Sequence, residues 1–333
     1  MALVPIRHPQ RDFFVLDIAD VMPKDDTASM EHPLFSLATR PDMRKLEYRA
    51  EDTLVKIEPS GRGLPTIFDK DILIFCISQL IHRKNNGEPI GKTVRFSARD
   101  LMIATNRTTD GESYQRLEDA FTRLRGTTFV SNIKTGGKIE TRIFGMIDSG
   151  GFVRTDDEKF RLDYCEVVLS DWLMRAIEAT EVVTINPDYF RIRRPLERRI
   201  YEIARKHCGK QKRFQIRLAK LQAKTGSSAP AKKFRLNLHE IIRKDVTPDY
   251  HIALDDNDLV TFTPRKAPPR VLSPSITVPS DAMEKAKILA VAKGWDLYAL
   301  EREFKEWAAT QPPPTKGYGP AFIGFVKKKP KAR

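Results

Sequence analysis

One stretch of the 333-residue chain concentrates the residue types that bind anions. The segment "KTGSSAPAKKFRLNLHEIIRK", from Lys224 to Lys244, is rich in lysine and arginine and contains one acid, Glu240. The wider block Arg191 to Lys244 holds 18 basic and three acidic residues, a net charge of +15, whereas the whole chain carries +14. Positive charge concentrated in a patterned segment is typical of polyanion binding, with nucleic acid first and an anionic membrane surface second. A solvated basic face is the alternative interpretation.

Motifs for catalysis are weak in this sequence. "GEPIGKT", from Gly87 to Thr93, resembles a phosphate-binding loop but has three residues between its glycines where four are needed. The six histidines form no HxH or HExxH pattern that would hold a metal. Tyr189 and Tyr201 could act as nicking nucleophiles only beside a metal or a base, and the sequence indicates neither. We therefore expect a binding protein without cofactor or metal, not an enzyme.

The composition indicates folded domains in a reducing compartment. Hydrophobic residues make up 41% and charged residues 31% of the chain, as in globular proteins. Its three cysteines form no CxxC pair, which argues against disulfides and zinc. The longest uncharged apolar run, Ile72 to Ile81, is shorter than a membrane span, and the start "MALVPIRHPQR" is unlike a secretory signal. We expect a cytoplasmic protein with no membrane partner.

The basic stretch must be positioned by the elements around it. "RPLERRIYEIARKHCG" predicts a helix ended by glycine, "RFQI" a strand and "RLAKLQAKTG" a second helix. In the basic stretch itself, Phe234, Leu238, Ile241 and Ile242 share one face of a third helix. "YHIALDDNDLVTF" then predicts a hairpin.

The same order occurs earlier in the chain. Helical patterns at 69–87, 97–106 and 111–126 enclose a short strand at 92–98, and "TFVSNIKTGGKIETRIFGMI" alternates on both sides of Gly136 and Gly137, as a tight hairpin does. A third helix followed by a hairpin is the winged-helix variant of the helix-turn-helix. The sequence thus predicts an α+β fold with these parts: an N-terminal arm 1–65, winged-helix domains 66–180 and 181–263, a Pro-rich linker 264–280, and a small helical C-terminal region with a basic tail 281–333.

In a helix-turn-helix the start of the third helix contacts base edges in the major groove. In the second domain this position holds Lys232, Lys233 and Arg235, with Asn237 and Arg243 also facing outward. The preceding turn offers Lys224, Ser227 and Ser228 to phosphates, although Ser228 could instead cap the helix. The tip "DDND", Asp255 to Asp258, should be repelled by DNA.

The first domain carries a milder set of candidate contacts. Its third helix exposes Gln115, Arg116 and Arg123, mixed with acids, which favours selective contact over bulk attraction. Its hairpin carries Lys134, Lys138 and Arg142, which could grip phosphates or could be charges that protect a solvated edge.

Several blocks of the sequence resemble the bacterial plasmid replication initiator A proteins. They are "RHPQRDFFVLDIADV", "MEHPLFSLATRPDMR", "TIFDKDILIFCISQL", "LRGTTFVSNIKTGG" and "RRPLERRIYEIARKHCG", and the similarity spans roughly Pro5 to Asp249. The resemblance implies a tandem winged-helix initiator without an enzymatic step. Such a protein binds repeated double-stranded origin DNA (iterons), helps to open adjacent AT-rich DNA and recruits a host helicase or its loader.

The resemblance also implies a homodimer, joined through the first domain, that represses its own promoter and is in equilibrium with a monomer that initiates replication. Such a protein is expected to be associated with the nucleoid or a plasmid. Two other hypotheses remain at this point: a winged-helix transcriptional repressor, and a strand-nicking replication enzyme.

Overall fold

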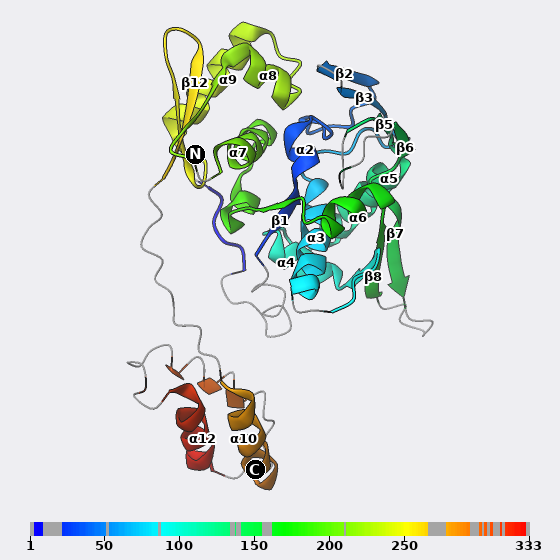
Figure 1. The fold of residues 1–333 in the computed structure, drawn as a ribbon. Coiled ribbons are helices and arrows are strands. Elements are labelled where there is room, and N and C mark those ends of the chain that lie inside the picture. The colour runs from blue at the N-terminus through cyan, green and yellow to red at the C-terminus, as the bar shows by residue number, and fades with distance from the viewer. Residues whose placement is uncertain are drawn as a thin grey trace. The chain divides into compact units, whose positions relative to one another are not determined.

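The chain folds as two compact units, Met1–Lys266 and Ala267–Arg333, in a computed structural model (Figure 1). The structure describes residues 3–8, 22–50, 53–85, 88–133, 137, 141–154, 162–209, 211–265, 278–293, 300–301, 303–304, 307–308, 314 and 317–330. Among these residues, no helix has the length and apolar character that crossing a membrane requires.

The first unit mixes helices with short antiparallel strands. Its helices are α2 (Thr27–Glu31), α3 (Lys70–Asn85), α4 (Ala98–Ala104), α5 (Gly111–Gly126), α6 (Asp171–Glu178), η1 (Pro187–Arg191, a 3-10 helix), α7 (Pro195–Cys208), α8 (Leu218–Thr225) and α9 (Ala231–Lys244). Its strands are β1 (Lys24–Asp26), β2 (Leu46–Ala50), β3 (Thr53–Glu58), β4 (Thr93–Phe96), β5 (Thr128–Ser131), β6 (Arg142–Phe144), β7 (Ile147–Arg154), β8 (Leu162–Leu169), β9 (Val182–Thr184), β10 (Phe214–Arg217), β11 (Tyr250–Leu254) and β12 (Leu259–Pro264).

The order helix, strand, helix, helix, hairpin occurs twice in this unit. The first copy is α3, β4, α4, α5 and the hairpin β7–β8, whose sheet has the strand order β4-β8-β7. The second copy is α7, β10, α8, α9 and the hairpin β11–β12, whose sheet has the order β10-β12-β11. In both sheets the strand between the first two helices pairs with the last strand of the hairpin. Matching element order therefore extends to matching strand order.

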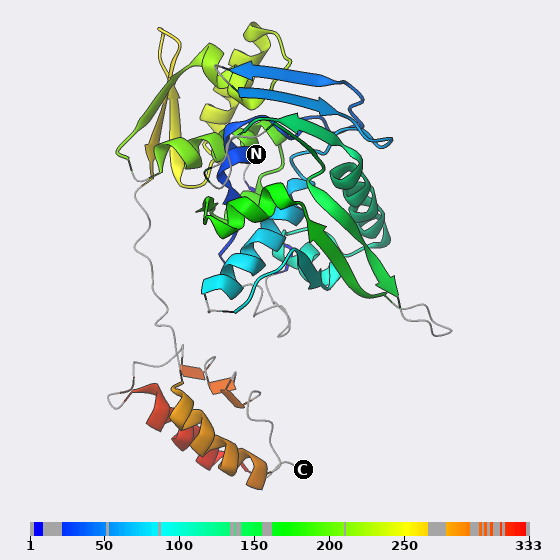
Figure 2. The same ribbon diagram turned by 45° about the vertical axis from the view of Figure 1, so that its right-hand side comes forward.

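One prediction about the first copy is corrected in part. The sequence predicts that the hairpin around Gly136 and Gly137 follows the third helix as the hairpin of the winged helix. The strands on either side, β5 and β6, do pair antiparallel, but they belong to a separate sheet of order β2-β3-β5-β6. Figure 2 shows the blue strands β2 and β3 running beside β5 at the top of the unit. The hairpin that pairs with β4 is β7–β8, which the sequence conceals because Gly150 and Gly151 lie inside a strand.

Two hydrophobic cores hold the first unit together. One gathers α3, α4 and α5 around residues such as Ile77, Leu117 and Phe129, and it includes most of the apolar stretch of α3. The other gathers α7, α8 and α9 around Tyr201, Phe234 and other buried residues. All three cysteines are free and buried.

Residues 22–65 pack within these two cores and do not form a separate arm. Strand β1 pairs with β9, Val55 and Ile57 of β3 are buried in the first core, and Met30 of α2 is buried in the second. Prolines divide this region into short apolar runs that show no helix or strand periodicity. Each of these runs packs against a segment that is distant in the sequence.

A buried set of charges joins the two cores. Lys70 of α3 is fully buried, and its ammonium lies 2.7 Å from the Asp25 carboxylate and 3.1 Å from that of Glu202 in α7. Nearby, Arg198 of α7 lies 2.6 Å from Asp71 of α3. Burial raises the pKa of Asp25 to about 8, because desolvation outweighs the attraction of Lys70. The two helices are therefore fixed to each other by charge pairs as well as by apolar packing.

The second unit is helical in its described residues. It contains α10 (Ser280–Ala292) and α12 (Tyr318–Lys328), which pack around Phe304 and Phe322. Trp307 of this unit is 49% exposed.

Candidate nucleic-acid interface

The start of α9 presents exposed lysines on a well-anchored helix. Phe234, Leu238 and Ile241 are buried, which fixes the rotation of α9 about its axis. Lys232, Lys233 and Arg243 are consequently exposed, while Arg235 and Asn237 are half-buried. The outward face predicted from helical spacing is therefore exposed at Lys232, Lys233 and Arg243 and half-buried at Arg235 and Asn237.

The turn before α9 is a tight left-handed one. Gly226 ends α8 with a φ of +70°, and Ser227 is half-buried and Ser228 exposed in the turn. The residue that precedes the first turn of α9 is Pro230, and no side chain caps the helix. The alternative that Ser228 is the N-cap is therefore wrong, and its hydroxyl lies at the surface.

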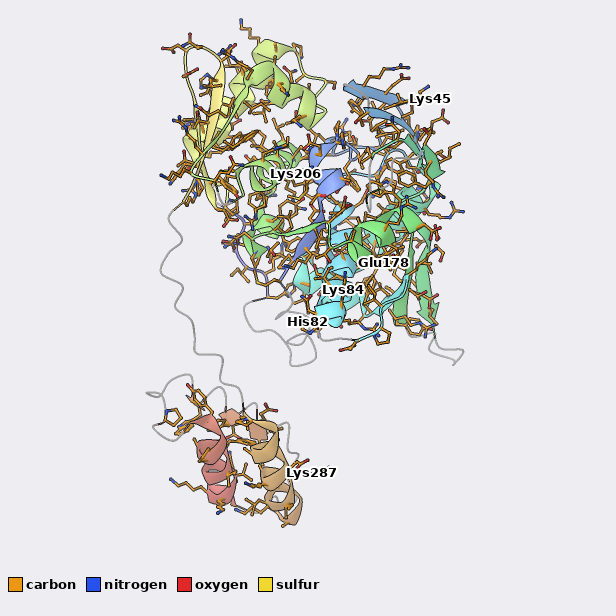
Figure 3. The ribbon with its side chains drawn as sticks, viewed as in Figure 1. Lys45, His82, Lys84, Glu178, Lys206 and Lys287 are labelled. Atoms are coloured by element: carbon orange, nitrogen blue, oxygen red, sulfur yellow. The ribbon has the colours of Figure 1, made fainter. Side chains whose placement is uncertain are left out.

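Lys224 does not face solvent as predicted. Its ammonium forms an ion pair with Glu31 of α2, and its side chain is only 20% exposed. Lys206 and His207 of α7 approach the same carboxylate at 3.1 and 2.8 Å, and Figure 3 shows Lys206 beside α2. Although burial opposes ionisation of Glu31, hydrogen bonds from His207 and Lys224 and the charge of Lys206 lower its pKa well below the usual range. Lys224 therefore neutralises an internal carboxylate and leaves phosphate contact to its neighbours.

Arg235 has an acidic partner on the adjacent hairpin. Its guanidinium forms an ion pair with Asp258 at the β11–β12 turn, with both side chains partly exposed. The same turn is held to β10 and α8, since the Arg217 guanidinium donates to the Asn257 carbonyl at 2.5 Å and the Leu218 amide donates to the Asp258 carbonyl at 2.8 Å. The acidic tip is thus folded back next to the start of α9, and one of its acids orients a candidate base-contacting residue.

The third helix of the first copy, α5, offers fewer free cations. Gln115 and Arg116 are exposed, and Arg116 forms an i,i+4 pair with Glu112. Arg123 is not available for DNA: its guanidinium donates to both carboxylate oxygens of Asp69, at 2.7 and 2.8 Å, and its side chain is 16% exposed. Helical spacing alone places Arg123 on the outer face, but it cannot show that the segment before α3 covers that position.

The basic hairpin is only partly described. Arg142, at the start of β6, is exposed and paired in register with Ser131. Lys134 and Lys138 lie outside the described residues. The sheet that carries Arg142 is joined to β2 and β3, so this side chain belongs to a different sheet from β7–β8.

The residues considered for catalysis are buried or bonded to other residues of the protein. Tyr189 and Tyr201 are buried, and their hydroxyls lie 2.7 Å from Glu202 and 2.9 Å from Asp249. "GEPIGKT" connects α3 to β4, and its Lys92 forms an ion pair with Asp171. Within the described part of the chain, no group of three or more His, Cys, Asp and Glu side chains could hold a metal ion.

Sequence reasoning missed the acids that control these cations. Glu31 and Asp258 each pair with a residue of the predicted interface, and Asp69 removes a third. Of these three acids, only Asp258 could have been anticipated from the sequence, because an acidic hairpin tip follows a basic helix and the two can form an ion pair. The partners of Lys224 and Arg123 are distant in sequence and have no local pattern.

Comparisons with known proteins agree with this architecture. The family described as "Replication initiator protein A" matches residues 24–252. A protein of Wigglesworthia glossinidia brevipalpis named "Putative replication protein" is 39% identical over 259 residues, which cover 77% of this chain and 94% of the relative.

Among solved structures, domains 2 and 3 of RctB superpose with a TM-score of 0.51 at 11% identity, covering 72% of this chain and 96% of that one. A second crystal structure of RctB domains 2 and 3 has a TM-score of 0.48 at 13% identity. The likeness to RctB concerns the fold. Because the family match covers more than half of the sequence and the relative is similar over nearly its whole length, the chain belongs to the replication initiator protein A family.

Proposed function

We propose that this protein is a plasmid replication initiator that binds repeated origin DNA through two winged helices. The observation that carries the proposal is the repeated unit, whose two copies have the same element order and the same strand order. In the second copy the third helix, α9, starts with exposed Lys232 and Lys233. An α-helix fits the major groove, and its first residues reach base edges. The family membership supports replication as the process.

The proposed interface is narrower than the charge of the sequence indicates. It comprises Lys232, Lys233, Arg235, Asn237 and Arg243 of α9 with Ser227 and Ser228 before it, Gln115 and Arg116 of α5, and Arg142 of the separate sheet β2-β3-β5-β6. Lys224 and Arg123 are left out because Glu31 and Asp69 hold them.

The proposal includes no chemical step of the protein's own. Burial of Tyr189 and Tyr201 argues against their use as nicking nucleophiles, since an attacking hydroxyl must reach the phosphodiester. Opening of AT-rich DNA, recruitment of a host helicase or its loader, repression of its own promoter by a dimer, and a cytoplasmic, plasmid-associated location complete the proposal. These follow the family resemblance.

Footprinting of the purified chain on its own replicon tests the function. We expect protection of several repeats at the origin, weakened by the Lys232→Ala/Lys233→Ala variant. Protection of a lone operator instead selects a repressor, and absence of any protected site overturns DNA recognition. Incubation with supercoiled origin plasmid and a divalent metal tests chemistry: nicking that a Tyr189→Phe or Tyr201→Phe variant abolishes would contradict a binding-only protein.

A further inference from the structure

A cavity of about 570 Å³ lies where several distant segments of the first unit meet. Its walls include the N-terminal residues Val4 and Arg7, the loop 38–41, the turn 105–108 between α4 and α5, and the segment 190–193 at the end of η1, and residues 64–71, α5 and Arg198 complete them. The N-terminal residues are tied to two of the other walls: the Arg7 amide donates to the Asn106 side chain at 2.8 Å, and the Val4 amide donates to the Arg191 carbonyl at 3.1 Å.

The cavity is strongly basic, with seven arginines and three aspartates in its lining. The aspartates are already engaged. Asp69 holds Arg123, Asp71 holds both Arg107 at 3.1 Å and Arg198 at 2.6 Å, and Asp119 faces Arg62 at 3.6 Å. Each cavity acid therefore already has an arginine partner other than Arg7, Arg40 and Arg193.

Three guanidinium groups remain at the rim of the cavity. Arg7, Arg40 and Arg193 are exposed, and none of them forms a side-chain hydrogen bond or ion pair with another residue in the described ranges. They come from three separate segments, so the fold and not the local sequence brings them together. Guanidinium groups converging on an open cavity suit an oxyanion with several acceptor oxygens, as a phosphate has.

The cavity adjoins α5, and a neighbouring hollow adjoins α9. Thr108, Ser113 and Arg116, at the start of α5, line one side of it. A second hollow, of about 280 Å³, lies against α9 and is lined by Ser227 and Asn237 together with Leu37 and Arg194. The chain segments 37–40 and 193–194 run from one hollow to the other, so they bridge the start of α5 and the middle of α9.

We infer that Arg7, Arg40 and Arg193 bind backbone phosphates of the DNA segment that spans the two helices, which rests on the proposed function. Two helices that enter grooves of one duplex are separated along it by sugar-phosphate backbone, and protein surface between them faces phosphates and not base edges. The same phosphate chemistry is offered by a free nucleoside triphosphate, which the experiment distinguishes.

The salt dependence of DNA affinity tests this site. Each phosphate contact contributes about −0.9 to the slope of log K against log salt. We therefore expect the Arg40→Gln/Arg193→Gln variant to flatten that slope by about 1.8 in a fluorescence anisotropy titration between about 50 and 200 mM salt. The ratio of specific to non-specific affinity should be unchanged, because phosphate contacts carry no sequence information. Both residues are exposed, so the urea unfolding midpoint of the variant should match that of the wild type.

A matched control removes the same charge elsewhere. Lys45, at the outer end of the β2–β3 sheet in Figure 3, and Arg125, near the end of α5, are exposed and do not line the cavity. The Lys45→Gln/Arg125→Gln variant should keep the wild-type slope. Equal slopes for both double variants, with specific binding intact in the wild type, would overturn the cavity assignment alone.

Two further outcomes separate the remaining possibilities. If calorimetry shows that the wild type binds ATP and the cavity variant does not, while the DNA slope is unchanged, the cavity takes a free nucleotide and the duplex assignment is overturned. If the wild type protects no DNA site in the footprinting experiment, the proposed function is wrong. In that case the inference that the cavity binds duplex DNA is wrong as well.

Discussion

At the level of single residues, the cations of the basic block fall into two groups: exposed cations that a ligand can reach, and buried cations that pair with internal acids. Lys232 and Lys233 are exposed at the start of α9, whereas Arg198 and Arg199 are buried and bind Asp71 and Glu202. Lys224 belongs to the second group because Glu31 holds it. An excess of positive charge in sequence therefore overestimates the positive charge available to a ligand.

The buried carboxyl of Asp25 makes stability depend on pH. Its pKa is about 8 in the folded protein and near 4 when unfolded, so the folded state holds the proton more tightly. The resulting stability is present below about pH 4 and is lost as pH rises towards 8. Asn cannot ionise. We expect the free energy of unfolding of Asp25→Asn, relative to the wild type, to rise across this window.

Urea denaturation of both proteins between about pH 5 and pH 8 measures this difference. Titration of Glu31 and of other groups that do not interact with Asp25 is common to the two proteins and largely cancels. A difference that is the same at every pH would mean that Asp25 is ionised throughout as the partner of Lys70.

Asp258 is expected to position Arg235 for base recognition. A partly exposed ion pair is worth about 0.2 to 1 kcal/mol, so Asp258→Asn should lower the ratio of specific to non-specific DNA affinity by up to about fivefold. Asp256→Asn removes the same charge from the same turn without touching Arg235 and should leave the ratio unchanged. Competition binding with specific and random duplexes measures both, and equal effects of the two variants would show that only net charge matters.

At the level of elements, the turn between α8 and α9 sets the direction of the proposed recognition helix. Gly226 has a φ of +70°, and a Cβ placed there would lie 2.6 Å from the Cβ of Pro33. The left-handed conformation costs a non-glycine residue about 1 to 2 kcal/mol, and the clash with the region before β2 adds to it. The turn is therefore fixed both by its own backbone and by a distant segment.

We expect Gly226→Ala to lower the free energy of unfolding by at least about 1 kcal/mol and to weaken DNA binding, since α9 must shift. Gly91→Ala is the matched control, because its φ is not positive and nothing lies within 4 Å of the added Cβ. Urea denaturation of both variants checks the difference. Equal stability of the two would contradict the role of this turn.

The sequence predicted the helices and strands well where their formation depends on residues close together in the chain. The helices of both copies and the hairpin β11–β12 occur where hydrophobic spacing and glycines indicated them. The predicted hairpin of the first copy also forms, but it joins another sheet, because β3 supplies the partner for β5. Spacing along the chain determines which strands exist, and burial against distant partners determines how they pair.

At the level of the whole molecule, the two compact units should be separable. The unit Met1–Lys266 contains both cores and all of the proposed DNA-contacting residues, and Ala267–Arg333 has a core of its own. We expect a chain ending at Lys266 to unfold with the urea midpoint of the first unit in the full chain and to protect the same DNA. Loss of cooperative unfolding on truncation would show that the first unit needs the second.

The sequence by itself determined the element order, the repeated unit, the exposed lysines of α9 and the resemblance to replication initiators. These depend on periodicity and composition within short windows, which local physics controls. The tertiary structure decided which hairpin pairs with β4 and which acids form ion pairs with Lys224, Arg123 and Arg235. It also decided which exposed arginines line the cavity beside α5. Ion pairs and sheet pairings join residues far apart in the chain, and only folding brings them within reach.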